Sequence, residues 1–276
     1  MSHALDAPLS ASAEPGVVAS VVAFAYKTGV IAELEVRKLR HDPTEMITRA
    51  VQPALWLLVF GEVFTRLRAI PTGGVPYLDF MAPGILAQSV LFVAIFFGIA
   101  VIWERDLGII HKLFVSPTPR GALVLGKALS AGIRSLSQVV IVYTLALLLG
   151  VRMNWHPLAL AGVISAVFVG AACFATLSLI IAALVKTRER FMGIGQVLTM
   201  PLFFASNAIY PLAIMPPWLR AVARLNPLSY EVDALRALMI VGGISTFGLW
   251  TDFALLGAIA TLLVIVAAYV YPRVVT

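Results

Sequence analysis

The stretch of this chain that comes nearest to a chemical motif is Gly121–Ala128, which reads GALVLGKA. It departs from the phosphate-binding loop pattern GxxxxGK[ST] at its last position, where Ala128 replaces the hydroxyl residue that holds Mg²⁺. Such a loop also lies between a buried strand and a helix, whereas the residues between these glycines are apolar and open a long apolar run. We therefore predict no nucleotide site here, so that any ATP hydrolysis coupled to this chain occurs on another one.

Residue sets for catalysis or metal binding are not evident elsewhere in the sequence. The 4 histidines share no helix-face spacing, and the 1 cysteine, Cys173, excludes a disulfide within the chain and a CxxC cluster. The acids nearest the apolar runs, Glu62, Glu104 and Asp252, fall at their ends rather than inside them. Glu62 and Arg66 have i, i+4 spacing, which favours a surface pair over a proton relay. We expect a chain that is not an enzyme and holds no cofactor or metal.

The composition indicates an integral membrane protein. Hydrophobic residues make up 61% of the 276 residues and charged residues only 12%, whereas soluble domains carry about 25% charged residues. The net charge of +6 is typical of cytoplasmic loops in such a protein, and we expect no nucleic-acid partner.

Six apolar runs approach or exceed the roughly 20 residues that a helical span requires. We predict an all-α polytopic membrane protein whose spans cover about residues 48–64, 80–103, 123–150, 157–185, 192–209 and 249–271. Residues 1–26 are predicted to form a disordered tail and the start of an interfacial helix, and residues 27–276 the transmembrane domain. No basic residue precedes the apolar stretch Val17–Tyr26, so we do not interpret it as a signal peptide.

The distribution of Lys and Arg predicts the orientation. Of the 20 basic residues, 14 fall in the N-terminal segment, the loop after the second span with the start of the third, the loop after the fourth span, and the C-terminus. Because cytoplasmic loops carry an excess of Lys and Arg, both termini are expected in the cytoplasm, as an even number of spans requires.

Two cytoplasmic segments are predicted not to span. Lys27–His41 mixes apolar and charged residues as an interfacial amphipathic helix does, although a solvated connector remains the alternative. Glu104–Arg120 carries Leu107, Ile110, Leu113 and Phe114 at helical spacing. That short helix would need a partner for its apolar stripe, or it would lie against the membrane surface.

A third segment, residues 210–248, is assigned to the outer side. Asn226-Pro227 combines a capping residue with proline at the first helical position, and Gly242-Gly243 provides a stop. Charges at Glu231, Asp233 and Arg236 would be costly in lipid, so a re-entrant hairpin is favoured over two more spans.

With these elements in place, the chain resembles the membrane subunit of ABC-2-type ATP-driven exporters, in the branch of daunorubicin-resistance and nodulation lipo-oligosaccharide permeases. One group of residues that carries the resemblance is Trp103-Glu104-Arg105-Asp106, Phe114-Val115-Ser116-Pro117 and Leu125-Gly126-Lys127. The other is residues 201–208 (PLFFASNA), 215–219 (MPPWL), 226–230 (NPLSY) and 234–236 (ALR). Many members have Glu-Arg-Gly-Thr-Leu-Glu in the loop, whereas this chain has RDLGII at 105–110 and lacks the second acid.

The resemblance implies two cytoplasmic ABC ATPase subunits, which would bind ATP and Mg²⁺, together with a second permease copy or a paralogue in a bacterial inner membrane. It implies a coupling helix that includes Glu104, Arg105, Asp106, Leu107, Ile110, Lys112, Leu113 and Phe114. The interfacial helix, with Arg37, Lys38 and Arg40, would also touch the ATPase. The outer hairpin would include Asn226, Pro227, Tyr230, Glu231 and Arg236.

The same resemblance implies a substrate path at the dimer interface between the second and fifth spans, with membrane lipids around it. Its candidate lining residues are Gln88, Ser89, Phe92, Phe203, Phe204 and Asn207. The polar ones could instead bond between helices, and the aromatic ones could simply pack. Apolar walls with few polar groups would suit an amphipathic drug-like or lipid-like cargo, and a polysaccharide or lipid-linked glycan is the alternative cargo. A distant alternative for the function itself is an ion-coupled carrier.

Overall fold

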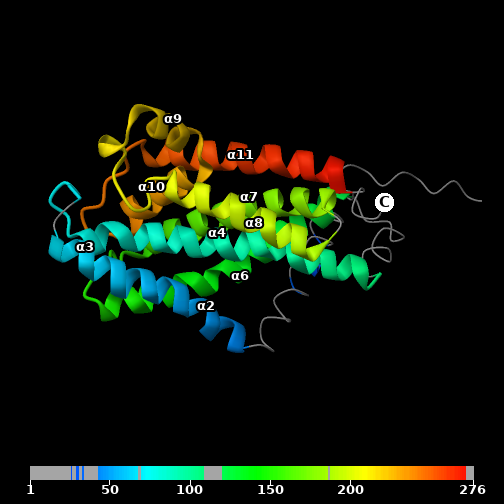
Figure 1. Cartoon of the computed structure of the whole chain (residues 1–276), viewed down its shortest axis with the longest axis horizontal. Coiled ribbons are helices and arrows are strands. Elements are labelled where there is room, and N and C mark those ends of the chain that lie inside the picture. Colours follow the sequence, from blue (N-terminus) through cyan, green and yellow to red (C-terminus); the bar gives the residue numbers. More distant parts are fainter. Residues whose placement is uncertain are drawn as a thin grey trace, which may run out of the picture.

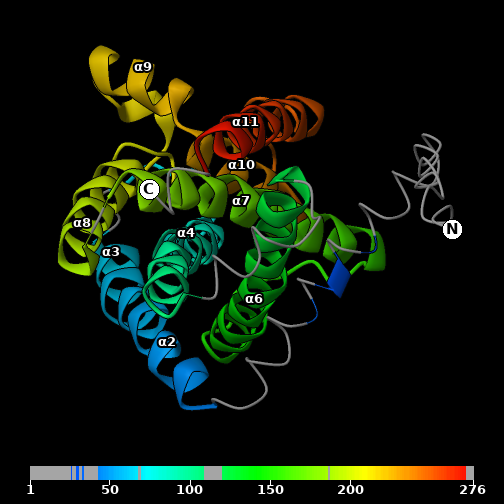
Figure 2. The ribbon, with the colours of Figure 1, turned by 90° about the vertical axis from the view of Figure 1, so that its right-hand side faces the viewer.

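The computed structural model describes residues 43–67, 70–108, 120–185 and 187–271, and the single residues Tyr26, Gly29, Val30 and Glu33. Within these ranges the chain is nearly all-helical, and the one extended pairing is an isolated antiparallel bridge between Met153 and Ile240. Figures 1 and 2 show long helices packed side by side. The predicted all-α class is confirmed for the described part of the chain.

In chain order the described helical elements are α2 (Pro43–Leu55), the π-helical segment η1 (Trp56–Gly61), α3 (Glu62–Leu67), α4 (Tyr77–Asp106), α6 (Arg120–Leu148), α7 (Pro157–Leu184), α8 (Arg188–Phe204), the 3₁₀ turn η2 (Leu212–Ile214), α9 (Pro217–Leu225), α10 (Pro227–Met239) and α11 (Leu249–Val270).

Five helical stretches in the described ranges are long and apolar enough to cross a membrane: Thr48–Leu67, Tyr77–Asp106, Leu123–Leu148, Pro157–Leu184 and Leu249–Val270. They correspond to five of the six predicted spans. The remaining one, predicted at 192–209, corresponds to α8, which begins at Arg188 and ends at Phe204 after 17 residues. The count of six spans is therefore not confirmed by helix length.

The end of α8 is capped by a side chain from a distant part of the sequence. The side-chain amide of Asn226 donates hydrogen bonds to the carbonyls of Leu202 and Ala205, at 2.6 and 3.1 Å. Carbonyls in the last turn of a helix have no partner within it, so this amide satisfies them. The Oδ1 atom of Asn226 also accepts a hydrogen bond from the Leu228 amide and caps α10. The helix start predicted at Asn226-Pro227 is confirmed.

The first apolar stretch is continuous but irregular. Pro53 lies inside α2 and has no amide hydrogen to donate, and the π-helical segment η1 follows at Trp56. π-helical turns occur where the regular hydrogen-bond ladder is disturbed, often at functional sites. Together with Leu249–Val270, this stretch is the least buried of the five, and Leu55, Leu58, Val59 and Phe60 are exposed.

Helix α4 lies at the centre of the bundle. Nearly all of its first two-thirds is buried, from Tyr77 to Ile95. In Figure 2 the other helices surround it, and it contacts α2, η1, α3, α6, α7, α8 and α10. An apolar helix buried on all sides is the expected arrangement for the core of a membrane bundle.

Small residues let α4 approach α7 closely and let α7 approach α10 closely. A methyl group on Gly98 would overlap the Ser178 hydroxyl and the Phe191 ring. The Gly98 amide donates a hydrogen bond to Ser178 Oγ at 3.0 Å, and Ser178 Oγ donates to the Ile95 carbonyl. Gly170 in turn leaves space for the carboxyl group of Glu231. Small residues serve this purpose at helix contacts in membranes.

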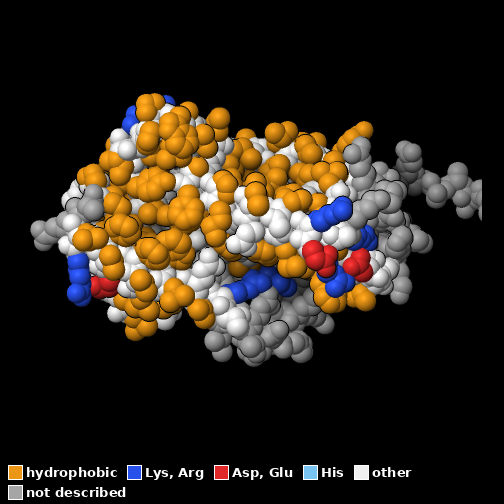
Figure 3. Space-filling view, in the orientation of Figure 1, with side chains coloured by type: hydrophobic (Ala, Val, Ile, Leu, Met, Phe, Trp, Pro, Cys, Tyr) orange, Lys and Arg blue, Asp and Glu red, His pale blue; other side chains and the backbone are white. Residues whose placement is uncertain are grey.

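The outer surface is apolar over the middle of the molecule. In Figure 3 hydrophobic side chains predominate over α8, α9 and α11, and the acidic side chains in view lie near the two ends. Val197, Leu262 and Tyr269 are among the large apolar side chains that are more than half exposed. Such a surface is compatible with lipid and not with water.

Candidate functional site

An ion pair joins the end of α4 to the start of α6. Lys127 Nζ donates hydrogen bonds to both carboxylate oxygens of Glu104, at 2.8 and 2.7 Å, and the two side chains are only 5% and 10% exposed. Lys127 Nζ also lies 5.7 Å from the centre of the Phe97 ring. The lysine of the rejected nucleotide motif is therefore bound to the predicted coupling residue Glu104.

A second, more exposed cluster joins α4 to α8. Asp106 accepts hydrogen bonds from Arg188 at 2.8 Å and from Arg105 at 3.2 and 3.3 Å. The Arg188 guanidinium stacks 3.6 Å from the centre of the Trp103 ring, and Arg105 also reaches the Val185 carbonyl at the end of α7. Four helices are thus tied together at one end of the bundle by Glu104, Arg105 and Asp106.

The rest of the predicted coupling surface lies largely outside the described residues. Leu107 is described and is 66% exposed just after the end of α4. Ile110, Lys112, Leu113 and Phe114, and the interfacial-helix residues Arg37, Lys38 and Arg40, all lie outside the described ranges.

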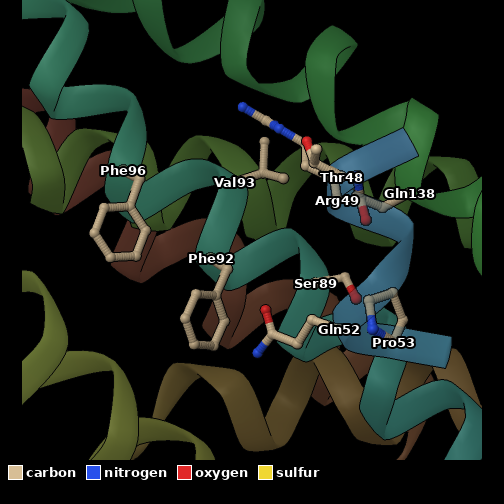
Figure 4. A pocket seen from close by; sticks show the side chains of 9 residues that line it. All are labelled: Thr48, Arg49, Gln52, Pro53, Ser89, Phe92, Val93, Phe96 and Gln138. Atoms are coloured by element: carbon tan, nitrogen blue, oxygen red, sulfur yellow. The ribbon is translucent and has the colours of Figure 1, made fainter. Parts of the chain in front are cut away.

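A cavity of about 240 Å³ opens between α2, α4 and α6 (Figure 4). Two of the predicted substrate-path residues, Ser89 and Phe92, belong to its wall. Figure 4 shows Phe92 and Phe96 of α4 on one side, with groups from α2 and α6 on the other. The full lining is Thr48, Arg49, Gln52, Pro53, Ser89, Phe92, Val93, Phe96 and Gln138.

The other four predicted path residues lie elsewhere. Gln88 is buried in α4, and Phe203 is buried with its ring 5.5 Å from that of Trp56. Phe204 is 43% exposed on α8. Asn207 is buried, and its side-chain amide has no hydrogen-bond partner in the described part of the chain. The structure therefore does not gather the six residues around one cavity.

Arg236 of α10 joins several segments at the end of the bundle where α9 and α10 lie. Its guanidinium donates to the Asn207 carbonyl at 2.8 Å and to the Phe80 carbonyl at 3.4 Å. It also stacks 3.8 Å from the centre of the Phe80 ring. Tyr230 Oη donates to the Arg224 carbonyl and so ties α10 to α9. Arg236 thus connects the helical pair α9–α10 to α4 and to the segment after α8.

Fully buried carboxyl groups, whose burial the sequence interpretation missed, lie at the same end of the bundle. The carboxyl group of Glu231 packs against Gly170, and neither of its oxygens has a hydrogen-bond partner among the described residues. Burial alone raises the pKa of Glu231 well above its ordinary value. Asp233 accepts hydrogen bonds from Ser245 Oγ and from the amides of Thr246 and Phe247. Ser245 Oγ also bonds to Asp252 Oδ2 at 2.8 Å.

For Glu231 and Asp233 the sequence favoured a re-entrant hairpin, because charges are costly in lipid, but it did not predict that they are buried. In the structure α10 packs against α4, α7 and α11, which keeps these carboxyl groups away from lipid. No local pattern in the sequence signals this burial, although Ser245, 12 residues after Asp233 and 7 before Asp252, hydrogen-bonds to both.

The fold and these sites define a multi-pass membrane protein of the transport type, with ion-paired helix ends on one side and a helical pair on the other. Residues 26–240 match the family of ABC-2 type transporters, and the chain belongs to this family. Its members are transport permeases, membrane subunits that in general work with ABC ATPase subunits.

Named relatives agree with this assignment. The chain is 29% identical over 205 residues to the ycf38 transport permease of Cyanophora paradoxa, covering 73% of this chain and 70% of that one. It is 29% identical over 214 residues to a daunorubicin resistance ABC transporter permease of Streptomyces coeruleorubidus, covering 76% and 72%. It is 26% identical over 170 residues to nodulation protein J of Rhizobium leguminosarum bv. trifolii, covering 61% and 64%. The resemblance read from the sequence is confirmed.

Proposed function

We propose that this chain is the membrane-spanning permease subunit of an ATP-driven exporter that moves an amphipathic, drug-like or lipid-like cargo out of the cytoplasm or inner leaflet. A separate ATPase chain supplies the energy and binds ATP and Mg²⁺. The observation that carries this proposal is that one helix, α4, includes both the ion-paired residue Glu104, next to the coupling segment, and part of the wall of the cavity.

The distances along α4 support this role. Phe96 of the cavity wall and Glu104 of the ion pair are eight residues apart, which corresponds to about 12 Å of helix. Because Lys127 and Arg188 fix the same end of α4 to α6 and α8, a push on the coupling segment would move three helices together. Such a movement exports cargo only if the cargo contacts differ between the two states.

The proposed complex contains two ATPase subunits and a second copy of this chain or a paralogue, with substrate passing between α4 and α8 of the two permeases. We propose that α8 is the sixth crossing, because it runs beside α4 and α7 (Figures 1 and 2). Both termini then lie in the cytoplasm, as the basic loops suggest. A bacterial inner membrane is the proposed location, and α9–α10 the re-entrant hairpin on the outer side.

There are two alternatives to this proposal, one for the cargo and one for the class of transporter. Export of a polysaccharide or lipid-linked glycan is the alternative cargo within the same class, and nodulation protein J is a relative by sequence. An ion-coupled carrier is the second class, and one observation favours it: Glu231 is a buried carboxyl group without a hydrogen-bond partner in the described ranges. Buried acids of this kind mark ion pathways in many carriers.

The proposal is tested by purifying the chain from its native membrane in mild detergent and identifying what accompanies it. We expect a stoichiometric ABC ATPase, and we expect replacement of Leu113 and Phe114 by Asp to remove it. The matched control replaces Val197 and Leu225, two exposed apolar residues, by Ser and should retain the ATPase. If no ATPase accompanies the wild-type chain, or if the Asp variant retains it, the proposed coupling is wrong.

A further inference from the structure

The cavity between α2, α4 and α6 has the chemistry of a site for an acidic group. Its nine described lining residues include one guanidinium, that of Arg49. Two amides, Gln52 and Gln138, face the same space, and Gln138 is only 1% exposed. Guanidinium and amide N–H groups are donors, and charge-assisted hydrogen bonds to an oxyanion are the strong ones.

The opposite wall is apolar and flat. The Phe92 and Phe96 rings are stacked with their centres 6.0 Å apart, and both border the cavity (Figure 4). Rings in this position exclude water from the polar side, which strengthens the electrostatic interactions made there. The site therefore combines an acid-binding side with a surface for hydrocarbon.

A second hollow continues from the first along the outer face of α2 and η1. It encloses about 420 Å³ and shares Thr48 and Gln52 with the cavity. Its remaining lining is Val51, Leu55, Trp56 and Phe60, all apolar, and Leu55 is 56% exposed. One molecule can thus contact the polar cavity and the apolar hollow at the same time.

The length of this path fits one half of a bilayer. Arg49 and Phe60 are eleven residues apart on a nearly continuous helix, which corresponds to about 17 Å. The hydrocarbon core of one leaflet is about 15 Å thick, half of the ~30 Å of the whole bilayer. Arg49 lies at the start of the first membrane-crossing stretch, where basic pockets between helices bind acidic lipid headgroups.

We propose that these two hollows form the loading site for an acidic lipid-like amphiphile of the cytoplasmic leaflet. Its headgroup binds Arg49, Gln52 and Gln138, and its hydrocarbon chain lies over Leu55, Trp56 and Phe60. This inference rests on the proposed function for the orientation of the chain and for the export of the bound molecule. Beyond the proposed function, it specifies that the cargo is acidic and that the cargo enters along α2 and η1.

Trp56 provides a direct probe of the hydrocarbon chain. The full chain, with any ATPase that purifies with it, is placed in phosphatidylcholine nanodiscs, and phosphatidylglycerol with brominated acyl chains is titrated in. Brominated phosphatidylcholine with the same chains is the neutral comparison. Trp56 is one of 5 tryptophans, so its quenching is taken as the difference between the wild-type chain and Trp56→Phe. We expect half-maximal quenching at an at least about tenfold lower mole fraction of the acidic lipid.

The variants test the headgroup contacts. Arg49→Gln is expected to shift the acidic-lipid curve by about tenfold or more and to leave the neutral curve in place, whereas Arg49→Lys should shift it less. Arg66→Gln is the matched control, because Arg66 lies at the other end of the same stretch with an 84% exposed side chain, and it should change neither curve. If Arg49→Gln does not fold, Gln52→Leu tests the same contact from a half-exposed position and should weaken acidic-lipid binding.

Equal quenching by the acidic and neutral lipids, or an acidic-lipid curve unchanged in these variants, would overturn the proposal. Adding ATP distinguishes a bound cargo from a resident membrane lipid. A loading site should lose quenching by acidic lipid of the cytoplasmic leaflet as ATP is hydrolysed, and quenching that ATP leaves unchanged would identify a resident lipid and refute loading. ATP-driven transport without acidic-lipid preference at Trp56 would refute this site alone. Arg49-dependent acidic-lipid binding in a chain with no ATPase would refute the proposed function and, with it, export from this site.

Discussion

Lys127 of α6 binds both carboxylate oxygens of Glu104 of α4, so one nearly buried ion pair holds the two helices together. The two residues are 23 positions apart, and the segment between them includes the predicted coupling helix. Both ends of that segment are thereby fixed to each other. A segment anchored in this way transmits movement to the helices instead of absorbing it.

Removing one member of this pair should destabilise the protein strongly. Glu104→Gln or Lys127→Met leaves the partner charge buried, which typically costs about 3–5 kcal/mol. Replacing both, as Glu104→Leu with Lys127→Met, should recover most of the loss, because a buried ion pair often contributes little net stability over apolar residues. Thermal unfolding of the purified variants measures these differences.

Glu62 and Arg66 supply the control for that experiment. They form an i, i+4 ion pair at 3.4 Å with side chains 51% and 84% exposed, so Glu62→Gln should change stability by less than about 1 kcal/mol. If Glu104→Gln were no more destabilising than Glu62→Gln, the role of the buried pair in fixing the coupling segment would be wrong.

The contact between α4 and α7 should be intolerant of added volume. Gly98→Ala places a methyl group where Ser178 Oγ and the Phe191 ring lie, and overpacking of this kind typically costs about 1–3 kcal/mol. Gly257→Ala in α11 is the matched control, because nothing lies within 4 Å of the added group, and a helical Gly→Ala change should be neutral or slightly stabilising. Equal melting temperatures for the two variants would show that α4 and α7 adjust freely.

The sequence alone predicted much of this architecture because lipid imposes simple rules. Five apolar runs became long helices close to their predicted bounds, and the cap at Asn226 was foreseen from local chemistry. The end of α8 was not foreseen, because Asn226 reaches its last carbonyls from a residue more than twenty positions away. Contacts of that range leave no local pattern in a single sequence.

The candidate site was predictable only in part for the same reason. Ser89 and Phe92 were selected on α4, but the cavity that they border is completed by Arg49 and Gln52 from α2 and Gln138 from α6. Those residues have no periodic relation to Ser89 in the sequence. The burial of Glu231 was likewise hidden, because it depends on the absence of a side chain at Gly170 on another helix.

Arg236 should not be replaceable by lysine. Its planar guanidinium bonds to the Asn207 and Phe80 carbonyls and stacks on the Phe80 ring, and a lysine ammonium cannot make all three contacts. We expect Arg236→Lys to lower stability by about 1–3 kcal/mol and to expose the segment 205–210 to proteolysis. Arg224→Lys, at an exposed position of α9, should have no effect on either measurement. A lysine variant as stable as the wild type would contradict the anchoring role of Arg236.

Glu231 should make stability depend on pH. Its pKa is raised in the folded chain, so the folded state holds this proton more tightly than the unfolded state. Stability is then lost as the pH rises above the unfolded value of about 4.3. Glu231→Gln removes this dependence and should melt higher than the wild type at pH 7.5, with a smaller difference at pH 5. Glu189→Gln, on the exposed surface of α8, is the control. A Gln variant that melts lower at pH 7.5 would show that the folded protein favours the charged carboxylate.

The most direct test of the account is the energy source of transport. Inside-out vesicles that contain the complex are loaded with a fluorescent acidic lipid in the outer monolayer, and its movement to the inner monolayer is followed. We predict movement that requires hydrolysable ATP, continues when the proton gradient is collapsed, and falls in Glu104→Gln and Arg49→Gln. Movement that persists without ATP and stops when the proton gradient is collapsed would contradict the ABC exporter proposal and point to Glu231 as the site of ion coupling.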